Sequence, residues 1–285
     1  MKILITGARG QLGVDLTRLA AEEPHHTVLA AGHDHLDVAD RDAVLSVVAR
    51  YGPDLILHAA AWTAVDACEA DPDRAWRVNA LGSRHVAEGA RAVGAHLVAV
   101  STDYVFDGTS EQAYTEWDRP NPQSVYGRSK LGGEAEVTAT WPGATVVRTS
   151  WVCGLHGSNM VKTILRLASA GGPMRFVDDQ RGCPTFTEDL AAKILQLGIA
   201  RRPGCFHVTN QGPTTWFQFA RDVLAAAGDD PARVDPIATS ELSPPRPASR
   251  PANSVLDNAA LRLSGIPLLA DHHEPLERTV KALAG

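Results

Sequence analysis

A tyrosine and a lysine stand four positions apart in the stretch "VYGRSK", residues 125–130. Tyr126 and Lys130 would share one face of a helix, because positions i and i+4 project in the same direction. An ammonium beside a phenol favours the ionised form, which lowers the phenol pKa from about 10 toward neutral pH. Such a phenol can protonate a carbonyl oxygen, so the pair predicts general acid catalysis. A chance pair on the surface has the same spacing, so other motifs must decide between the two readings.

Three glycines near the N-terminus form a second motif, "ITGARGQLG", residues 5–13. An apolar run before it predicts a strand, and the residues after it predict a helix. Gly7 would allow a tight turn, and Gly10 would let a pyrophosphate approach backbone N–H groups. Gly13 would let the helix pack closely on the sheet. This position between a strand and a helix favours dinucleotide binding over an ordinary turn.

A threonine follows the apolar residues 96–100, in the stretch "STDYVFDG". Open α/β sheets bind their ligands at the carboxyl ends of strands, and residues 96–100 predict a buried strand. The hydroxyl of Thr102 can therefore donate a hydrogen bond to a substrate oxygen. The alternative is a strand-end threonine that bonds to the nearby backbone.

The first half of the chain alternates predicted strands with predicted helices, which indicates a doubly wound parallel sheet of the Rossmann type. We predict a dinucleotide-binding domain over residues 1–151, to which residues 174–199 return. A smaller C-terminal lobe, over residues 152–173 and 200–285, would bind the substrate. The proline-rich stretch "SPPRPASRP", residues 243–251, predicts an irregular binding loop within that lobe.

Composition narrows the classes of protein that the chain can represent. It has 285 residues and a formal net charge of -6, which argues against broad nucleic-acid binding. No apolar run is long enough for a membrane helix, and Met1 leads directly into a strand, so neither a membrane segment nor a signal peptide is expected. The four cysteines lack the spacing of a zinc site. These features favour a reduced, cytoplasmic enzyme.

Eight stretches occur in the order in which the dTDP-4-dehydrorhamnose reductases carry them. They are "GARGQLG", "AAAWTAVDACE", "VNA", "STDYVFDG", "VYGRSKLGGE", "RTSWV", "DDQRGCPT" and "PASRPANS". The chain therefore resembles this family of extended short-chain dehydrogenases/reductases over essentially its whole length. The glycine and tyrosine motifs are shared across the superfamily, whereas the threonine motif and the last two stretches are more specific.

The resemblance implies a reaction and a role for each matching residue. The C4 keto group of dTDP-4-dehydro-L-rhamnose would be reduced to give dTDP-L-rhamnose, in deoxysugar biosynthesis. Tyr126 would protonate the C4 oxygen, and Thr102 would hold that oxygen. Lys130 would bind the nicotinamide ribose and lower the pKa of the tyrosine.

The expected cofactor is NADPH, with NADH possible, because Arg9 stands beside the glycine turn and can reach a 2′-phosphate. Asp34 is the one carboxylate that leaves this preference open. The expected cofactor contacts, taken from the glycine motif, from Arg9 and from the resemblance, are Gly7, Arg9, Gly10, Gln11, Leu12, Gly13, Asp37, Val38, Ala61, Trp62 and Thr63, together with Tyr126 and Lys130.

The expected substrate contacts come from two arguments. The resemblance implies that Thr102, Asp103 and Trp151 contact the nucleotide sugar. A diphosphate also needs cationic partners in a chain of net charge -6, and the proline-rich loop supplies Arg246 and Arg250.

The resemblance further implies a homodimer bridged by Mg²⁺. Its predicted ligands are Asp15, Glu188 and Glu277, which lie far apart in the sequence. Hard carboxylate oxygens suit Mg²⁺, and three clustered carboxylates without a cation would repel one another. The alternative is that all three are ordinary surface charges near helix ends.

Three other functions stay open. A 4,6-dehydratase would share the fold but needs a glutamate where this chain has Tyr104. A non-catalytic dinucleotide-binding subunit would not need an intact catalytic set. A 4-ketoreductase for a related nucleotide deoxysugar is also possible, because Trp62 and Cys153 depart from the family pattern near the pocket, which leaves the identity of the hexose open.

Overall fold

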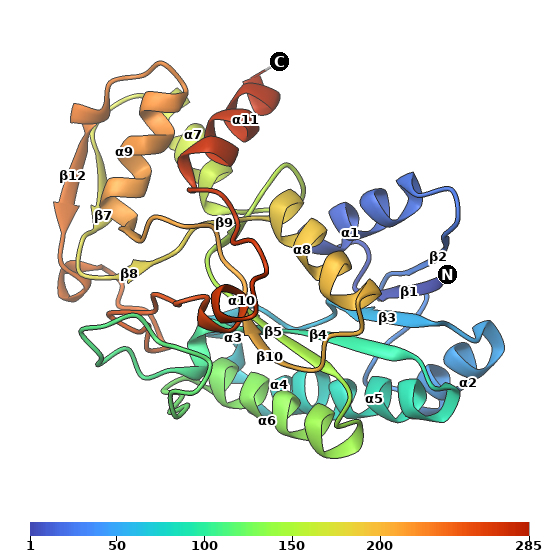
Figure 1. The fold of residues 1–285 in the computed structure, drawn as a ribbon. Coiled ribbons are helices and arrows are strands. Elements are labelled where there is room, and N and C mark those ends of the chain that lie inside the picture. Colours follow the sequence, from blue (N-terminus) through green and yellow to red (C-terminus); the bar gives the residue numbers. More distant parts are fainter. Residues whose placement is uncertain (285) are drawn as a thin grey trace.

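Six parallel strands form the central sheet of the computed structural model, which describes residues 1–284 (Figure 1). Across the sheet the strands are β10 (Gly204–His207), β5 (Thr145–Thr149), β4 (His96–Thr102), β3 (Leu55–His58), β1 (Lys2–Thr6) and β2 (Thr27–Ala31). Every neighbouring pair is parallel. The strand order reverses between β1 and β3, the place at which doubly wound sheets bind ligands. The predicted fold class is therefore confirmed.

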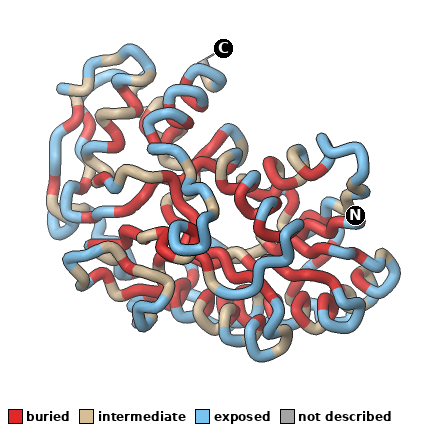
Figure 2. Tube along the Cα trace, in the orientation of Figure 1, coloured by how far each residue is buried: buried red, intermediate tan, exposed pale blue. Residues whose placement is uncertain are grey.

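Helices cover both faces of this sheet. One layer consists of α1 (Gln11–Glu22) and α8 (Thr187–Ile199), and the other of α2 (Arg41–Tyr51), α5 (Gly82–Val93) and α6 (Val125–Thr140). Side chains alternate along a strand, so Ile3 and Ile5 pack toward the first layer and Leu4 toward the second. Figure 2 shows the buried residues concentrated in the sheet and on the helix faces that contact it.

Two glycines explain how closely α1 approaches the sheet. Gly7 has a φ of 69°, in the left-handed region that side chains rarely adopt. A Cβ atom on Gly13 would lie 2.1 Å from the backbone oxygen of Gly7, which leaves no space for any other residue there. The glycine turn therefore brings the first turn of α1 directly over the end of β1.

A second, smaller core lies in the C-terminal lobe, at the left and top of Figure 1. The lobe contains α7 (Met160–Ser169), β7 (Met174–Val177), α9 (Trp216–Ala226), β12 (Val234–Ile237) and α11 (His273–Ala284). Strands β7 and β12 pair in parallel, separately from the central sheet. Met174, Phe219 and Leu276 are buried together in this core.

Two segments lie elsewhere than predicted. Residues 174–177 form β7 in the lobe, so only α8 of the segment 174–199 returns to the sheet. Residues 204–207, expected in the lobe, form the edge strand β10 of the central sheet. Short apolar runs look alike in the sequence, and only the strand that each one contacts decides its sheet. The division of the chain into two functional parts otherwise stays a prediction.

Short elements connect these layers. They are α3 (Val65–Ala70), α4 (Pro72–Trp76), a π-helical turn (Arg77–Leu81), β6 (Val152–Cys153), β8 (Arg181–Gly182), β9 (Thr185–Phe186), β11 (Thr214–Thr215), α10 (Ala259–Leu263) and 3₁₀ turns at Asp103–Val105, Pro231–Arg233 and Thr239–Glu241. Within residues 1–284, no helix combines the length and the apolar content that a membrane crossing requires.

Candidate active site

Three predicted catalytic residues meet at the carboxyl end of β4. Thr102 is the last residue of β4, and Tyr126 lies in the first turn of α6. Ser124 begins that helix, because its side chain accepts a hydrogen bond of 3.1 Å from the Gly127 N–H. The side chains of Thr102 and Tyr126 are buried, and a hydrogen-bonding interaction between them lowers the phenol pKa in part. The phenol and the hydroxyl are therefore placed to share one substrate oxygen.

Lys130 follows Tyr126 by one helical turn and is also buried. Its ammonium donates a hydrogen bond of 2.7 Å to the Val100 carbonyl oxygen on β4. Burial lowers the pKa of Lys130 to about 8, because a charged amine loses its hydration in the interior.

The predicted lowering of the Tyr126 pKa is wrong for the protein chain by itself. Burial raises the pKa of the phenol well above its ordinary value of 10, and this exceeds the opposing effect of Thr102. The Lys130 ammonium is held by the Val100 carbonyl, and its own pKa is lowered. At neutral pH Tyr126 is therefore a protonated phenol, which is the form that donates a proton.

The neighbouring Asp103 is a buried carboxylate. Its Oδ1 accepts a hydrogen bond of 3.0 Å from Thr102, whereas Oδ2 has no hydrogen-bond partner among the described residues. Burial raises the pKa of Asp103 to about 6. Tyr104 follows, and its ring packs edge-on against Tyr126 at 5.6 Å between centroids. Burial raises the pKa of Tyr104 to about 12, so this position supplies no base for an elimination.

A groove of about 280 Å³ opens where β1 and β3 end. Of the predicted cofactor contacts, Gly7, Arg9, Gly10, Asp37, Val38, Ala61 and Trp62 line it. Gly10 precedes α1 without a side-chain cap, and the first turn of α1 carries no acidic residue. Its free N–H groups therefore suit a pyrophosphate. The residues present fit a dinucleotide.

Other predicted cofactor residues have different positions. Leu12 is part of the core beneath the sheet, and Gly13 serves the packing of α1 on β1. Gln11 accepts a hydrogen bond of 3.0 Å from Asn159 at the start of α7, and Thr63 is exposed beside the groove. None of these four residues lines the groove: the side chains of Leu12 and Gln11 face the core and the lobe, Gly13 has no side chain, and Thr63 is exposed.

Sequence reasoning missed several residues of this groove. His33, Leu36, Ala59, Ala60, Arg74 and Val78 also line it. The Arg74 guanidinium lies 4.5 Å from the centre of the Trp62 ring. Asn79 is buried and holds the Trp62 backbone, accepting from its N–H at 2.8 Å and donating to its carbonyl at 3.1 Å. The stretch "VNA" contained Asn79, but no role had been predicted for it.

Arg9 is paired with Asp34 at 2.8 Å, and both side chains are largely exposed. Asp34 follows β2 by three residues, so the pair lies at the rim of the groove, on the side of the sheet where a dinucleotide's adenosine ribose is expected. Arg9, the cation expected to bind a 2′-phosphate, therefore contacts Asp34, the carboxylate that leaves the cofactor preference open.

The predicted substrate residues lie between the sheet and the lobe. Trp151 stacks on Trp216 of α9, with 3.5 Å between ring centroids. Arg250 does not present a free charge as predicted, because both of its terminal nitrogens donate to the Asp66 carboxylate, at 2.5 and 2.7 Å. Arg246 is exposed and makes no ion pair within the described residues.

The three predicted magnesium ligands are not brought together among the residues described. Arg18 lies 3.6 Å from Asp15 and 2.9 Å from Glu188. Arg278 also contacts Glu188, at 3.4 Å, and Glu277 is exposed on α11. Guanidinium groups already neutralise two of the three carboxylates, so within one chain the arrangement has no need of a cation.

Comparisons with known proteins agree with this geometry. The family described as the RmlD substrate binding domain matches residues 1–284. The dTDP-4-dehydrorhamnose reductase of Streptomyces griseus is 42% identical over 99% of this chain and 94% of that protein. A probable dTDP-4,6-dihydroxy-2-methyloxan-3-one 4-ketoreductase of Streptomyces antibioticus is 43% identical over 97% of this chain and 93% of that protein.

A solved structure shows the same fold. The dTDP-4-dehydrorhamnose reductase of Bacillus anthracis, solved in complex with NADP, is 38% identical and superposes with a TM-score of 0.93 over 99% of both chains. These matches confirm the predicted family and enzyme class. With relatives and a family profile that match it from end to end, this chain belongs to the dTDP-4-dehydrorhamnose reductase family.

Proposed function

We propose that this chain reduces the C4 keto group of dTDP-4-dehydro-L-rhamnose to give dTDP-L-rhamnose, with NADPH as the cofactor. The observation that carries the proposal is the meeting of Thr102, Tyr126 and Lys130 at the end of β4, beside a glycine-lined groove. Full-length relatives with the same reductase name support the choice of substrate.

The reaction adds a hydride to the carbon and a proton to the oxygen of the keto group. When bound, the nicotinamide cofactor supplies the hydride. Tyr126 supplies the proton, because its buried phenol is protonated at neutral pH. The alkoxide that develops on C4 is more basic than a phenolate, so the transfer is favourable despite the high pKa of Tyr126. Thr102 donates a hydrogen bond that orients the same oxygen.

Lys130 has a positioning role for the phenol and a binding role toward the cofactor ribose. Its ammonium is fixed by the Val100 carbonyl, and its pKa of about 8 keeps it mostly charged at neutral pH.

The groove favours NADPH through Arg9, with NADH possible. Its guanidinium lies at the rim at which a 2′-phosphate would lie, where Asp34 pairs with it and would compete with the phosphate. The NADP complex of the Bacillus anthracis relative supports this choice. Asp103 and Trp151 would contact the sugar, and Arg246 and Arg250 the diphosphate.

One alternative has a specific observation in its favour. The Streptomyces antibioticus relative, which is named a probable 4-ketoreductase for a different deoxysugar nucleotide, is as similar as the rhamnose enzyme.

The proposed chemistry requires no magnesium, and the predicted ligands Asp15, Glu188 and Glu277 do not meet within one chain. A homodimer stays a prediction. Light scattering and activity assays with and without EDTA test both the magnesium ion and the homodimer. A monomer that is fully active in EDTA would exclude the magnesium-bridged dimer.

The decisive experiment incubates the purified protein with NADPH and dTDP-4-dehydro-L-rhamnose, follows NADPH oxidation and determines the product configuration by NMR. We expect dTDP-L-rhamnose. A faster reaction with a different 4-keto sugar nucleotide would favour the alternative reductase. Cofactor binding without any turnover would identify a non-catalytic subunit instead.

A further inference from the structure

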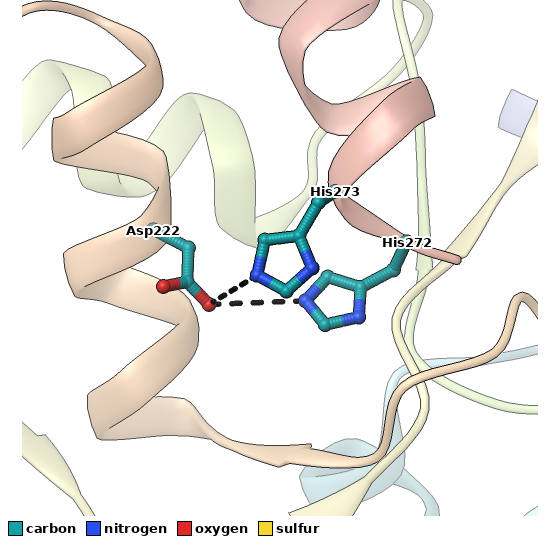
Figure 3. Close-up of side chains that lie close together, drawn as sticks. All are labelled: Asp222, His272 and His273. Atoms are coloured by element: carbon teal, nitrogen blue, oxygen red, sulfur yellow. Dashed lines mark ion pairs between the residues drawn. The ribbon is translucent and has the colours of Figure 1, made fainter.

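One carboxylate and two imidazoles face one another in the C-terminal lobe, outside the predicted active site (Figure 3). Asp222 lies on α9, His273 begins α11, and His272 directly precedes it. One oxygen of Asp222 lies 3.8 Å from Nε2 of His272 and 3.6 Å from Nε2 of His273. Within residues 1–284 no other three histidine, cysteine or acidic side chains converge in this way.

In each imidazole, the hydrogen-bond partner of Nδ1 determines whether Nδ1 or Nε2 carries the proton. Nδ1 of His272 faces the Gln211 carbonyl oxygen at 3.2 Å, and Nδ1 of His273 faces an Asp271 carboxylate oxygen at 2.6 Å. Both partners are acceptors, so both Nδ1 atoms carry hydrogen in the neutral rings. Each Nε2 then presents a lone pair toward the Asp222 carboxylate. Three electron-rich atoms in such proximity repel one another unless a metal ion or a proton lies between them.

Burial makes this requirement stronger at His272. Its side chain is only 2% exposed, and its Nε2 has no hydrogen-bond partner among the described residues. A buried polar atom without a partner costs free energy that a ligand can recover. The His273 side chain is 58% exposed, so an ion can reach the cluster from solvent.

We propose that Asp222, His272 and His273 bind a divalent transition-metal ion, with Zn²⁺ as the preferred ion. Two imidazole nitrogens with one carboxylate oxygen suit zinc, whereas Mg²⁺ and Ca²⁺ prefer oxygen ligands alone. Zinc bonds of about 2.0–2.1 Å in a tetrahedron place the ligand atoms about 3.3 Å apart. The two carboxylate–imidazole distances exceed this by only a few tenths of an ångström. The two rings stack at 4.1 Å between centroids, so the exposed His273 ring would turn for both Nε2 atoms to face one ion, and solvent would complete the tetrahedron.

Neighbouring groups already orient these ligands. A carboxylate behind a metal-binding histidine is a common arrangement, and Asp271 occupies that position behind His273. Gln218 donates a hydrogen bond of 2.8 Å to the other oxygen of Asp222 and so fixes the carboxylate plane. A bound ion would connect α9 to the start of α11, adding a link to the apolar contacts between these helices. Its role would therefore be structural, independent of the proposed reductase chemistry.

The test uses the full-length protein, freed of metal with a chelator and then titrated with Co²⁺ and Zn²⁺. We expect one tightly bound ion per chain, a visible Co²⁺ spectrum of a four-coordinate site, and loss of that spectrum when Zn²⁺ is added. The Asp222→Asn and His273→Ala variants should bind at least tenfold more weakly, because the first removes the negative charge of a ligand and the second removes a ligand. His25→Ala removes an exposed imidazole elsewhere and serves as the matched control, with unchanged affinity.

Thermal unfolding gives a second readout. Zn²⁺ should raise the melting temperature of the wild type and of His25→Ala but not of His273→Ala, because an ion that binds only the folded state stabilises it. Protonated imidazoles could satisfy Asp222 without a metal. The wild type would then show no saturable binding, and that result would overturn the proposal, as would equal binding by all variants.

Discussion

The ammonium of Lys130 donates a hydrogen bond of 2.7 Å to the backbone carbonyl of Val100, two residues before the end of β4. This hydrogen bond connects α6 to β4, the strand that ends with Thr102. Tyr126 lies one turn earlier on the same helix, so the bond also sets the distance between phenol and hydroxyl. The lysine thus positions the proposed acid, in addition to its expected contact with the cofactor.

The first prediction concerns Tyr126→Phe. Loss of the proton donor should lower kcat by roughly 10²–10⁴-fold, which is the usual contribution of a general acid. NADPH binding, measured by fluorescence titration, should change much less, because the phenol does not line the dinucleotide groove. Tyr104→Phe is the matched control, since it removes the neighbouring hydroxyl, and its kcat should fall much less. Near-normal turnover in Tyr126→Phe would remove this residue from the mechanism.

The second prediction concerns the Arg9–Asp34 pair. Arg9→Ala should lower the preference for NADPH over NADH by up to roughly fivefold, because an exposed charge pair contributes at most about 1 kcal/mol. Asp34→Ala should change the preference in the opposite direction, because it frees the guanidinium and removes a repelling carboxylate. The ratio of kcat/KM for the two cofactors measures both effects. Equal ratios in all three proteins would exclude the pair from cofactor selection.

The third prediction separates two roles for Arg250. If its guanidinium contacts the diphosphate, Arg250→Ala should raise KM for the sugar nucleotide at least tenfold and leave KM for NADPH nearly unchanged. Asp66→Asn, which releases the arginine, should then retain or improve substrate binding. If the ion pair is only structural, both variants should lose stability, and both KM values should change together. Arg246→Ala removes the other proposed diphosphate contact and should raise the same KM, without loss of stability because Arg246 is exposed and makes no ion pair among the described residues.

The fourth prediction uses the buried Asp103. Its pKa is raised from 3.8 to about 6, so the folded state holds its proton between these values while the unfolded state releases it. The wild type therefore loses up to about 3 kcal/mol of stability as the pH rises through this window, at ~1.4 kcal/mol per pKa unit. Asp103→Asn removes this loss.

Urea unfolding of both proteins at about pH 5 and about pH 7.5 measures the difference. The stabilisation by Asp103→Asn should be larger at the higher pH, together with a raised KM for the sugar nucleotide. A stabilisation that is the same at both pH values would show that the carboxyl does not titrate in this window.

Local patterns were enough to predict the central fold and the proximity of Thr102, Tyr126 and Lys130, whose catalytic roles stay a prediction. Apolar runs bounded by glycine and by helix-start residues identify strands and helices within a few positions. Tyr126 and Lys130 are held at one turn's separation by the helix itself, so their proximity follows from spacing. Thr102 joins them because it ends a strand next to that helix, and the carboxyl ends of parallel strands meet at one edge.

Features that depend on residues far apart in the sequence could not be predicted from such local patterns. Arg250 is paired with Asp66, which is 184 positions away, so its charge could not be judged from the proline-rich loop alone. The raised pKa of Tyr126 results from burial by several elements, which the Tyr–Lys spacing does not report. Asp222 and the two adjacent histidines meet only because α11 packs against α9.

The edge strand β10 has a consequence for the synthesis of the protein. It is built from residues 204–207, which pair with β5 only after the polypeptide has passed through the lobe. While the ribosome is still translating the intervening residues, the fully buried β5 has one unpaired edge, and such edges are prone to join other chains. Nascent chains that stall before His207 should therefore be clients of chaperones, and truncation near residue 151 should yield aggregates rather than an isolated cofactor-binding unit.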